Sequence, residues 1–315
     1  MDLIPAPFHA HISHGPPGGA AHWISAADGP RLRVGHWPLD GARGTVLIFP
    51  GRTEFIEKYG QVAAAFAQRG LASVAIDWRG QGLSDRLLDN PLVGHVEHFT
   101  DYQKDVAALM RALRHLNLPR PSHLLAHSMG GAIGLRAVME GLSVRAAVFS
   151  GPMWGIRMAP HLRPAAWLLG HVMPGIGQGH RLPPGTKIDH HVLTDGFDDN
   201  LLTRDPEQFE IMRQQLIECP EMALGGPSYV WLRESLAETR HLAGRPSPGL
   251  PCLTLLGSNE RIVDVPAIHR RMEAWPGGQL EIVDPGEHEV LMEGPAVTEP
   301  LFDRILTHFD KSTGR

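Results

Sequence analysis

Apolar and polar positions follow a strand–helix rhythm along most of the chain. Short apolar runs bounded by turn residues predict strands buried on both faces, at residues 45–49, 71–76, 124–126, 144–149, 252–256 and 280–283. Residues 22–24 and 32–37 read as two further strands joined by a turn at Asp28-Gly29. Apolar residues at helical spacing predict helices at 57–69, 100–115, 128–140, 266–275 and 297–309. The alternation predicts an α/β fold, with a mostly parallel sheet covered by helices on both faces.

The rhythm breaks after residue 150. From 151 to 249 the pattern contains helix-like pieces at 165–172, 206–218 and 228–242, separated by links rich in Pro and Gly, and no buried strand. This region is therefore predicted to be an inserted helical cap or lid. The core would consist of residues 22–150 and 250–315, on either side of the insertion.

The first 21 residues are rich in His, Pro and Gly. A metal site formed by His9, His11 and His14 is one interpretation of this composition. We favour a flexible N-terminal arm, because glycine and proline here fix no ligand geometry. No metal and no cofactor is expected elsewhere in the chain.

Composition is that of an ordinary globular protein. Of the 315 residues, 43% are hydrophobic and 20% charged, and the formal net charge is -5 without a long run of either sign. This balance gives no reason to expect a nucleic-acid partner. Two cysteines make no disulfide framework, and residues 1–10 lack the features of a signal peptide. We therefore expect a cytoplasmic protein, and peripheral contact with the inner membrane face is compatible with this composition.

Ser128 lies between a predicted strand and a predicted helix, in the sequence His-Ser-Met-Gly-Gly. Small residues flank it, with Ala126 two positions before and Gly130 two positions after. This arrangement resembles the nucleophile elbow of an α/β-hydrolase, whose tight turn lifts the serine hydroxyl clear of the sheet. The backbone N–H of Met129 would then point toward a developing oxyanion. The glycine-containing segment 77–84 is expected to shape the floor beside this turn.

A serine nucleophile needs a base and a carboxylate that orients it, and in this fold the chain order is Ser, acid, His. Two carboxylates follow the predicted strand 252–256. Glu260 lies on the loop itself, whereas Asp264 looks like the N-cap of a helix that begins with Val265-Pro266. Glu260 is favoured as the acid, and Asp264 is the alternative. His288 is the expected base, because it alone follows the last predicted strand at the position this fold requires.

The second oxyanion donor is expected just after the strand 45–49. Gly51 allows a close backbone approach there, so the N–H of Arg52 is the natural partner of the Met129 N–H. Two roles remain open for the Arg52 side chain. It meets an anionic group of a substrate, or it pairs with Glu54 or Glu57.

Large apolar residues gather at the start of the predicted cap. Met153, Trp154 and Met158, together with Gly51, are the candidate substrate-binding residues. An acyl-chain pocket or a membrane-docking surface would use such side chains. The alternative is that they simply pack the cap onto the core.

Five motifs together resemble one branch of the α/β-hydrolases. P-G-R-T-E, D-W-R-G-Q-G-L-S-D, H-S-M-G-G, G-S-N-E-R-I-V-D and G-E-H-E-V-L are similar to the monoacylglycerol lipase and lysophospholipase branch, which includes the serine aminopeptidase S33-type and lysophospholipase L2-like proteins. The resemblance spans residues 34–149 and 251–309. It implies that Ser128 is the nucleophile, His288 the base and Glu260 the acid, where relatives more often have Asp. Ala126 for Gly and Pro50 for His are departures that remove no catalytic group.

The expected function is hydrolysis of a carboxylic ester through an acyl-enzyme. The resemblance implies a monoacylglycerol or lysophospholipid substrate, with transient membrane-surface contact through the cap. One alternative is an aminopeptidase or thioesterase on the same fold, and a peptidase would need cap carboxylates such as Glu207, Glu210 or Glu221 to meet the substrate ammonium. Another alternative is a catalytically silent binding protein.

Overall fold

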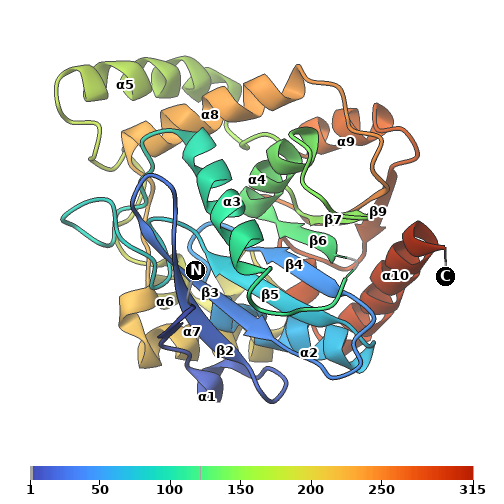
Figure 1. Ribbon diagram of the computed structural model, residues 1–315. Helices are drawn as coiled ribbons and strands as arrows, with labels where there is room; N and C mark the ends of the chain where they lie inside the picture. Colours follow the sequence, from blue (N-terminus) through green and yellow to red (C-terminus); the bar gives the residue numbers. More distant parts are fainter. Residues whose placement is uncertain (1–2, 121, 315) are drawn as a thin grey trace.

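The computed structural model describes residues 3–120 and 122–314 and is centred on one nine-stranded sheet (Figure 1). The strand order is β1-β2-β3-β5-β4-β6-β7-β8-β9. The first three pairs in this order, β1–β2, β2–β3 and β3–β5, are antiparallel. The other five pairs are parallel. The strands are β1 (Ile4–Ala6), β2 (Ala20–Ser25), β3 (Arg31–Trp37), β4 (Thr45–Phe49), β5 (Ala72–Asp77), β6 (Ser122–His127), β7 (Ala147–Ser150), β8 (Cys252–Gly257) and β9 (Gln279–Val283). The predicted mostly parallel α/β sheet is confirmed.

Helices cover both faces of this sheet, as the apolar runs of the central strands require. On one face α2 and α10 pack through Phe66, Phe302 and Phe309 against β4, β5 and β8. On the other face α3, α4 and α9 pack through residues such as Leu109, Ile133 and Ile268. The helices are α2 (Gly60–Gln68), α3 (Tyr102–Ala112), α4 (Ser128–Met139), α9 (Val265–Glu273) and α10 (Pro295–Thr313). Each of them overlaps a helix predicted from the sequence.

The N-terminal segment is ordered from residue 3 onward, which differs from the expected flexible arm; residues 1 and 2 lie outside the described residues. β1 pairs with β2, and the short helix α1 (Ala10–Ser13) follows it. Phe8 packs edge-on against Trp37 with ring centroids 5.9 Å apart. The arm is held because β2 would otherwise present an unpaired edge, which β1 covers.

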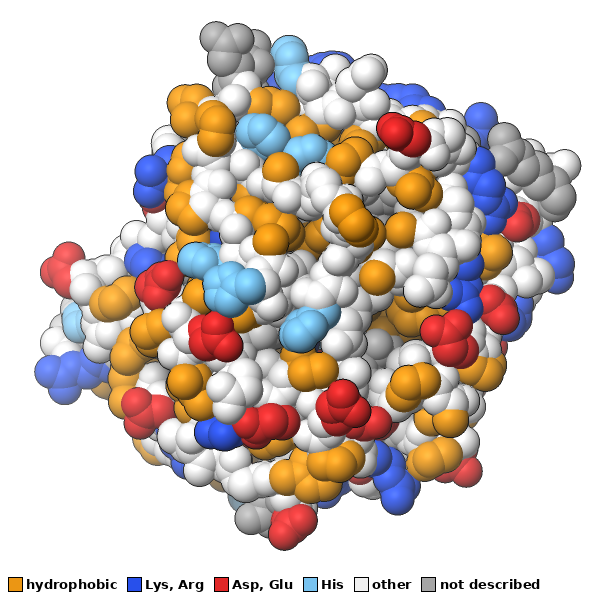
Figure 2. All heavy atoms as spheres, turned by 90° about the horizontal axis from the view of Figure 1, so that it is seen from below, with side chains coloured by type: hydrophobic (Ala, Val, Ile, Leu, Met, Phe, Trp, Pro, Cys, Tyr) orange, Lys and Arg blue, Asp and Glu red, His pale blue; other side chains and the backbone are white. Residues whose placement is uncertain are grey.

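The region between β7 and β8 contains helices and no strand among its described residues. Its helices are α5 (Arg163–Gly175), α6 (His191–Thr194), α7 (Pro206–Glu218) and α8 (Tyr229–Ala243). They form two groups, because α5 packs on α8 at one end of the molecule while α6 packs on α7 near α1 (Figure 1). Among the described residues, none of the helices combines the length and the apolar composition that a membrane span requires. On the face shown in Figure 2, acidic, basic, histidine and hydrophobic side chains are interspersed.

Candidate active site

Ser128 sits on a strained turn where β6 ends and α4 begins. Its φ is +49°, in the left-handed region that a residue with a Cβ rarely adopts. A Cβ at Gly130 would lie 2.1 Å from the carbonyl oxygen of Phe49, so only glycine lets the turn approach β4 this closely. The methyl of Ala126 fits because it faces Gly134, where an added Cβ would stand 3.1 Å away. The turn is thus built by small residues on both sides of the serine.

Three side chains far apart in sequence form one hydrogen-bonded chain at this turn. His288 Nε2 lies 2.9 Å from Ser128 Oγ, and His288 Nδ1 lies 2.6 Å from Glu260 Oε2. With the proton on Nδ1 donated to Glu260, Nε2 is left to accept the serine O–H. Gly151 makes room for this imidazole, since a Cβ there would lie 3.0 Å from Nδ1. The structure therefore brings together the three residues that the sequence predicted.

Glu260 is held as a carboxylate. Its Oε1 accepts the backbone N–H groups of Ile262 at 2.6 Å and Val263 at 3.1 Å. Burial opposes ionisation, but the hydrogen bond and charge of His288, with these two N–H groups, outweigh it and lower the pKa of Glu260. The alternative acid, Asp264, instead caps α9 by accepting the N–H of Ala267 at 3.3 Å.

A buried charge cluster supports the loop after β4, and sequence reasoning missed it. Glu54 accepts hydrogen bonds from the Gly51 N–H and, at 2.6 Å, from the Tyr59 hydroxyl. Lys58 bridges Glu54 and Glu289, each at 2.7 Å. Burial opposes ionisation of Glu54, but the charge of Lys58 outweighs it and the pKa of Glu54 falls to about 2.

Segment 77–84 also fixes this loop. Gln81 Nε2 donates to the carbonyl oxygen of Gly51 at 2.8 Å, and Trp78 Nε1 donates to that of Pro50 at 2.9 Å. The backbone that carries the predicted oxyanion donor Arg52 is therefore anchored by two hydrogen bonds from segment 77–84. Met129, the other predicted donor, lies in the first turn of α4, where backbone N–H groups have no partner within the helix.

A cavity of about 270 Å³ opens above Ser128 and His288. Met153, a predicted substrate contact, lines it together with Ile156 and Trp231. Trp154 and Met158 do not: they line a neighbouring cavity of about 450 Å³, and Ile156 lines both.

The prediction for Trp154 is corrected by its packing. Its Nε1 donates to the carbonyl oxygen of Gly131 at 3.1 Å, and its ring stacks on Trp275. Gly51, also predicted to bind substrate, supports the loop and is not among the residues lining the cavity above Ser128.

Arg52 lines the same cavity, and its guanidinium has no carboxylate partner in the described part of the chain. Glu54 forms an ion pair with Lys58, and Glu57 forms one with Arg33. Neither of the predicted ion pairs with Arg52 is therefore present. Arg52 Nη2 donates to the carbonyl oxygen of Gly225, and the guanidinium lies over the ring of Trp231, 5.3 Å from its centroid. Its Nε is buried and has no hydrogen-bond partner within residues 3–120 and 122–314. Burial lowers the pKa of Arg52 to about 10, so the group stays cationic at neutral pH.

Comparisons with known proteins identify the family of this chain. The model of the family described as serine aminopeptidase, S33, matches residues 40–295. Lysophospholipase L2 of Escherichia coli K12 is 32% identical over 277 residues, which cover 84% of this chain and 80% of that protein. Monoacylglycerol lipase of Mycolicibacterium smegmatis is 32% identical over 164 residues, 49% of this chain and 55% of that one.

A solved structure shows the same fold. A soluble variant of monoglyceride lipase from Saccharomyces cerevisiae, in complex with a substrate analog, superposes with a TM-score of 0.69 at 19% identity, covering 92% of this chain and 94% of the other. The family match spans most of the chain, and the L2 relative exceeds 30% identity over most of both sequences. The chain therefore belongs to the serine aminopeptidase S33 family of the α/β-hydrolases, in the lysophospholipase and monoacylglycerol lipase branch, and is a serine ester hydrolase.

Proposed function

We propose that Ser128, His288 and Glu260 form the catalytic triad of a lysophospholipase. The observation that carries the proposal is the hydrogen-bonded chain from Ser128 Oγ through His288 to Glu260. His288 Nε2 takes the serine proton as Oγ attacks the ester carbonyl, and Glu260 stabilises the imidazolium that forms. His288 then protonates the leaving alcohol, and water repeats the sequence on the acyl-enzyme.

The backbone N–H groups of Arg52 and Met129 are the proposed oxyanion hole. Both lie where the strand-end loop and the elbow meet, and the anchoring of that loop by Glu54 and Gln81 supports the assignment. Donors fixed in advance stabilise the tetrahedral intermediate without reorganising, and each such donor is typically worth about 10²–10³ in rate.

Arg52 favours a substrate with an anionic group. Arg52 lines the cavity, and its cationic guanidinium has no compensating carboxylate among the described residues. A phosphate on the leaving alcohol would supply that charge, and a guanidinium binds phosphate with charge-assisted hydrogen bonds. We therefore favour a lysophospholipid over the neutral monoacylglycerol, which the family also suggests. The apolar wall formed by Met153, Ile156 and Trp231 suits the acyl chain.

We further propose that residues 151–249 act as a cap that touches membrane surfaces through α5. Five large apolar side chains along α5 and at its two flanks are exposed: Leu162, Trp167, Leu168, Val172 and Ile176. Exposed apolar side chains along a helix suit contact with a membrane interface. Contact would be transient and peripheral, and consistent with a cytoplasmic protein acting at the inner membrane face.

An aminopeptidase is less well supported. Its substrate ammonium needs an unpaired carboxylate in the cavity, but Glu54 and Glu289, which line it, both bind Lys58. Glu210, one of the carboxylates considered for this role, is exposed and pairs with Arg213. A thioesterase would use the same triad, so only turnover separates it from an esterase.

A substrate panel tests the proposal. The purified protein is assayed with lysophosphatidylcholine, lysophosphatidylglycerol, a monoacylglycerol of the same chain length, its acyl-CoA and an aminoacyl-naphthylamide. We expect the highest kcat/KM for the lysophospholipids. Preference for the naphthylamide or the acyl-CoA would replace this assignment with the peptidase or thioesterase. No turnover of any of them, with Ser128 reactive toward a fluorophosphonate, would favour a binding protein.

A further inference from the structure

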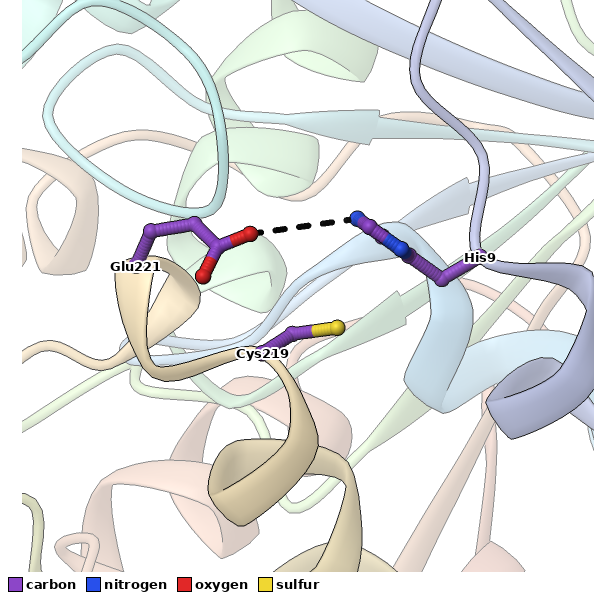
Figure 3. Close-up of side chains that lie close together, drawn as sticks. All are labelled: His9, Cys219 and Glu221. Carbon is purple, nitrogen blue, oxygen red and sulfur yellow. Dashed lines mark ion pairs between the residues drawn. The ribbon is translucent and has the colours of Figure 1, made fainter.

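Three different metal-ligating side chains converge outside the active site, between the N-terminal segment and α7. His9 precedes α1, Cys219 follows the last residue of α7, and Glu221 lies two residues further on (Figure 3). One ligand atom from each lies within 4.8 Å of the others, and Figure 3 shows the imidazole and the thiol directed toward a common gap beside the carboxylate. His9 Nε2 and Glu221 Oε1 are 4.0 Å apart.

The imidazole of this cluster lacks a hydrogen bond at one nitrogen. His9 Nε2 is buried and has no hydrogen-bond partner among the described residues, and its distance to the exposed Glu221 carboxylate exceeds that of a hydrogen bond. Cys219 is a free thiol that is only 3% exposed. A buried nitrogen without a partner normally costs stability unless another group or an ion occupies its lone pair.

Hydrogen bonds and an ion pair already hold the N-terminal segment against α7 around this cluster. The backbone N–H of His9 donates to Glu57 Oε1 at 3.1 Å. This hydrogen bond fixes the backbone position from which the imidazole extends. Gln215 Nε2 of α7 donates to the carbonyl oxygen of Ile12 at 2.8 Å, and His11 pairs with Glu218 at 3.1 Å. The two segments are therefore held together before any ion binds, so little chain entropy opposes binding.

We propose that His9, Cys219 and Glu221 bind a zinc ion that clamps the N-terminal segment to α7. One thiolate, one imidazole and one carboxylate form a three-ligand set that suits Zn²⁺, with water in the fourth position. Ligand atoms on one tetrahedral zinc lie about 3.3–3.7 Å apart. Side-chain rotations that move the ligand atoms by about 1 Å close the cluster around the ion. Binding deprotonates Cys219 and releases that proton to solvent.

A second group of possible ligands carries no such inference. Glu54, His127 and Glu289 also lie close together, but the ammonium of Lys58 already bridges both carboxylates. The Nδ1–H of His127 donates to the carbonyl oxygen of Ser150 at 2.9 Å, and burial lowers the pKa of His127 to about 3. That group belongs to the support of the active site.

Cobalt substitution tests the zinc site through its thiolate. The full-length protein is stripped with a chelator and titrated with Co²⁺, then with Zn²⁺. We expect a sulfur-to-cobalt charge-transfer band that saturates at one equivalent and is abolished by Zn²⁺. Cys219→Ser should lose the band, and His9→Ala should weaken Zn²⁺ binding by about 10-fold or more. Cys252→Ser and His14→Ala are the matched controls, because they change the other cysteine and an exposed histidine of the same segment, and both should retain the band.

A stability measurement separates a site from a folding defect. At a hundredfold excess over Kd, Zn²⁺ should raise the Tm of the wild type by about 5 °C or more and leave the Tm of Cys219→Ser unchanged. Absence of the charge-transfer band in the wild type, or its persistence in Cys219→Ser, would overturn the proposal. Ester hydrolysis by the stripped protein does not test the zinc site, because none of the three proposed zinc ligands lines the cavity above Ser128.

Discussion

Glu54 accepts a hydrogen bond from the backbone N–H of Gly51, the residue directly before Arg52. The same carboxylate binds Lys58, whose ammonium also contacts Glu289, the residue directly after His288. One buried charge cluster therefore touches both the loop proposed to hold the oxyanion and the loop that carries the imidazole. This relationship gives Glu54 a positioning role rather than a place in the chemistry.

Glu54→Gln should lower kcat by about 10–100-fold with little change in KM, because the oxyanion loop loses its anchor while the cavity wall stays. Steady-state kinetics on a p-nitrophenyl ester measure both constants. Glu210→Gln, which removes an exposed carboxylate that pairs with Arg213, is the control and should behave as the wild type. An unchanged kcat in a folded Glu54→Gln variant would remove the positioning role.

Glu260 and Asp264 should respond very differently to loss of charge. Glu260→Gln should reduce kcat by about 10³–10⁴-fold, because an amide no longer stabilises the imidazolium. Asp264→Asn should leave kcat within about 3-fold of the wild type, since an Asn side chain still caps α9. Parallel kinetics on one ester check the order, and the reverse order would transfer the role of acid to Asp264.

Replacing the Arg52 guanidinium tests the anion preference. Arg52→Gln should lower kcat/KM for a lysophospholipid by about 10–100-fold, the effect of losing a charge-assisted hydrogen bond in a cavity. Turnover of a monoacylglycerol of equal chain length should change by less than about 3-fold, because the backbone N–H of residue 52 remains. Equal losses on both substrates would mean that the side chain supports the cap through Gly225 and does not read the substrate.

The exposed face of α5 should matter only at a lipid surface. Trp167→Ser with Leu168→Ser should reduce binding to anionic vesicles and turnover of vesicle-bound substrate by about 10-fold or more, since two large apolar side chains leave the interface. Turnover of a water-soluble short-chain ester should not change. Ile282→Ser on β9, a side chain that is 48% exposed, is the control. Wild-type vesicle activity in the double variant would rule out docking through α5.

The parallel sheet was predictable because each central strand is a continuous apolar run, and such runs must be buried on both faces. Periodicity placed Ser128, Glu260 and His288 just after strands whose carboxyl ends lie at one edge of the sheet. The resemblance to a nucleophile elbow, with its chain order of Ser, acid and His, then selected these residues as a triad.

Other features depend on contacts that no local pattern encodes. β1 has three residues, and its pairing with β2 depends on an open sheet edge rather than on its own sequence. Lys58 and Glu289 are 231 positions apart, so the cluster that fixes Glu54 could not be read from spacing. The i,i+4 pair of Glu54 and Lys58 was the one local signal. Trp154 was misplaced because its partner Gly131 lies on α4, across the core.

The most direct test of the account is turnover by Ser128→Ala. The variant should retain the far-UV circular dichroism and Tm of the wild type, because Ser128 Oγ bonds only to His288 among the described residues. Its kcat on a lysophospholipid should fall by about 10⁴-fold or more, and a fluorophosphonate that labels the wild type at residue 128 should leave it unlabelled. Undiminished turnover by the folded variant would contradict the assignment of Ser128 as the nucleophile.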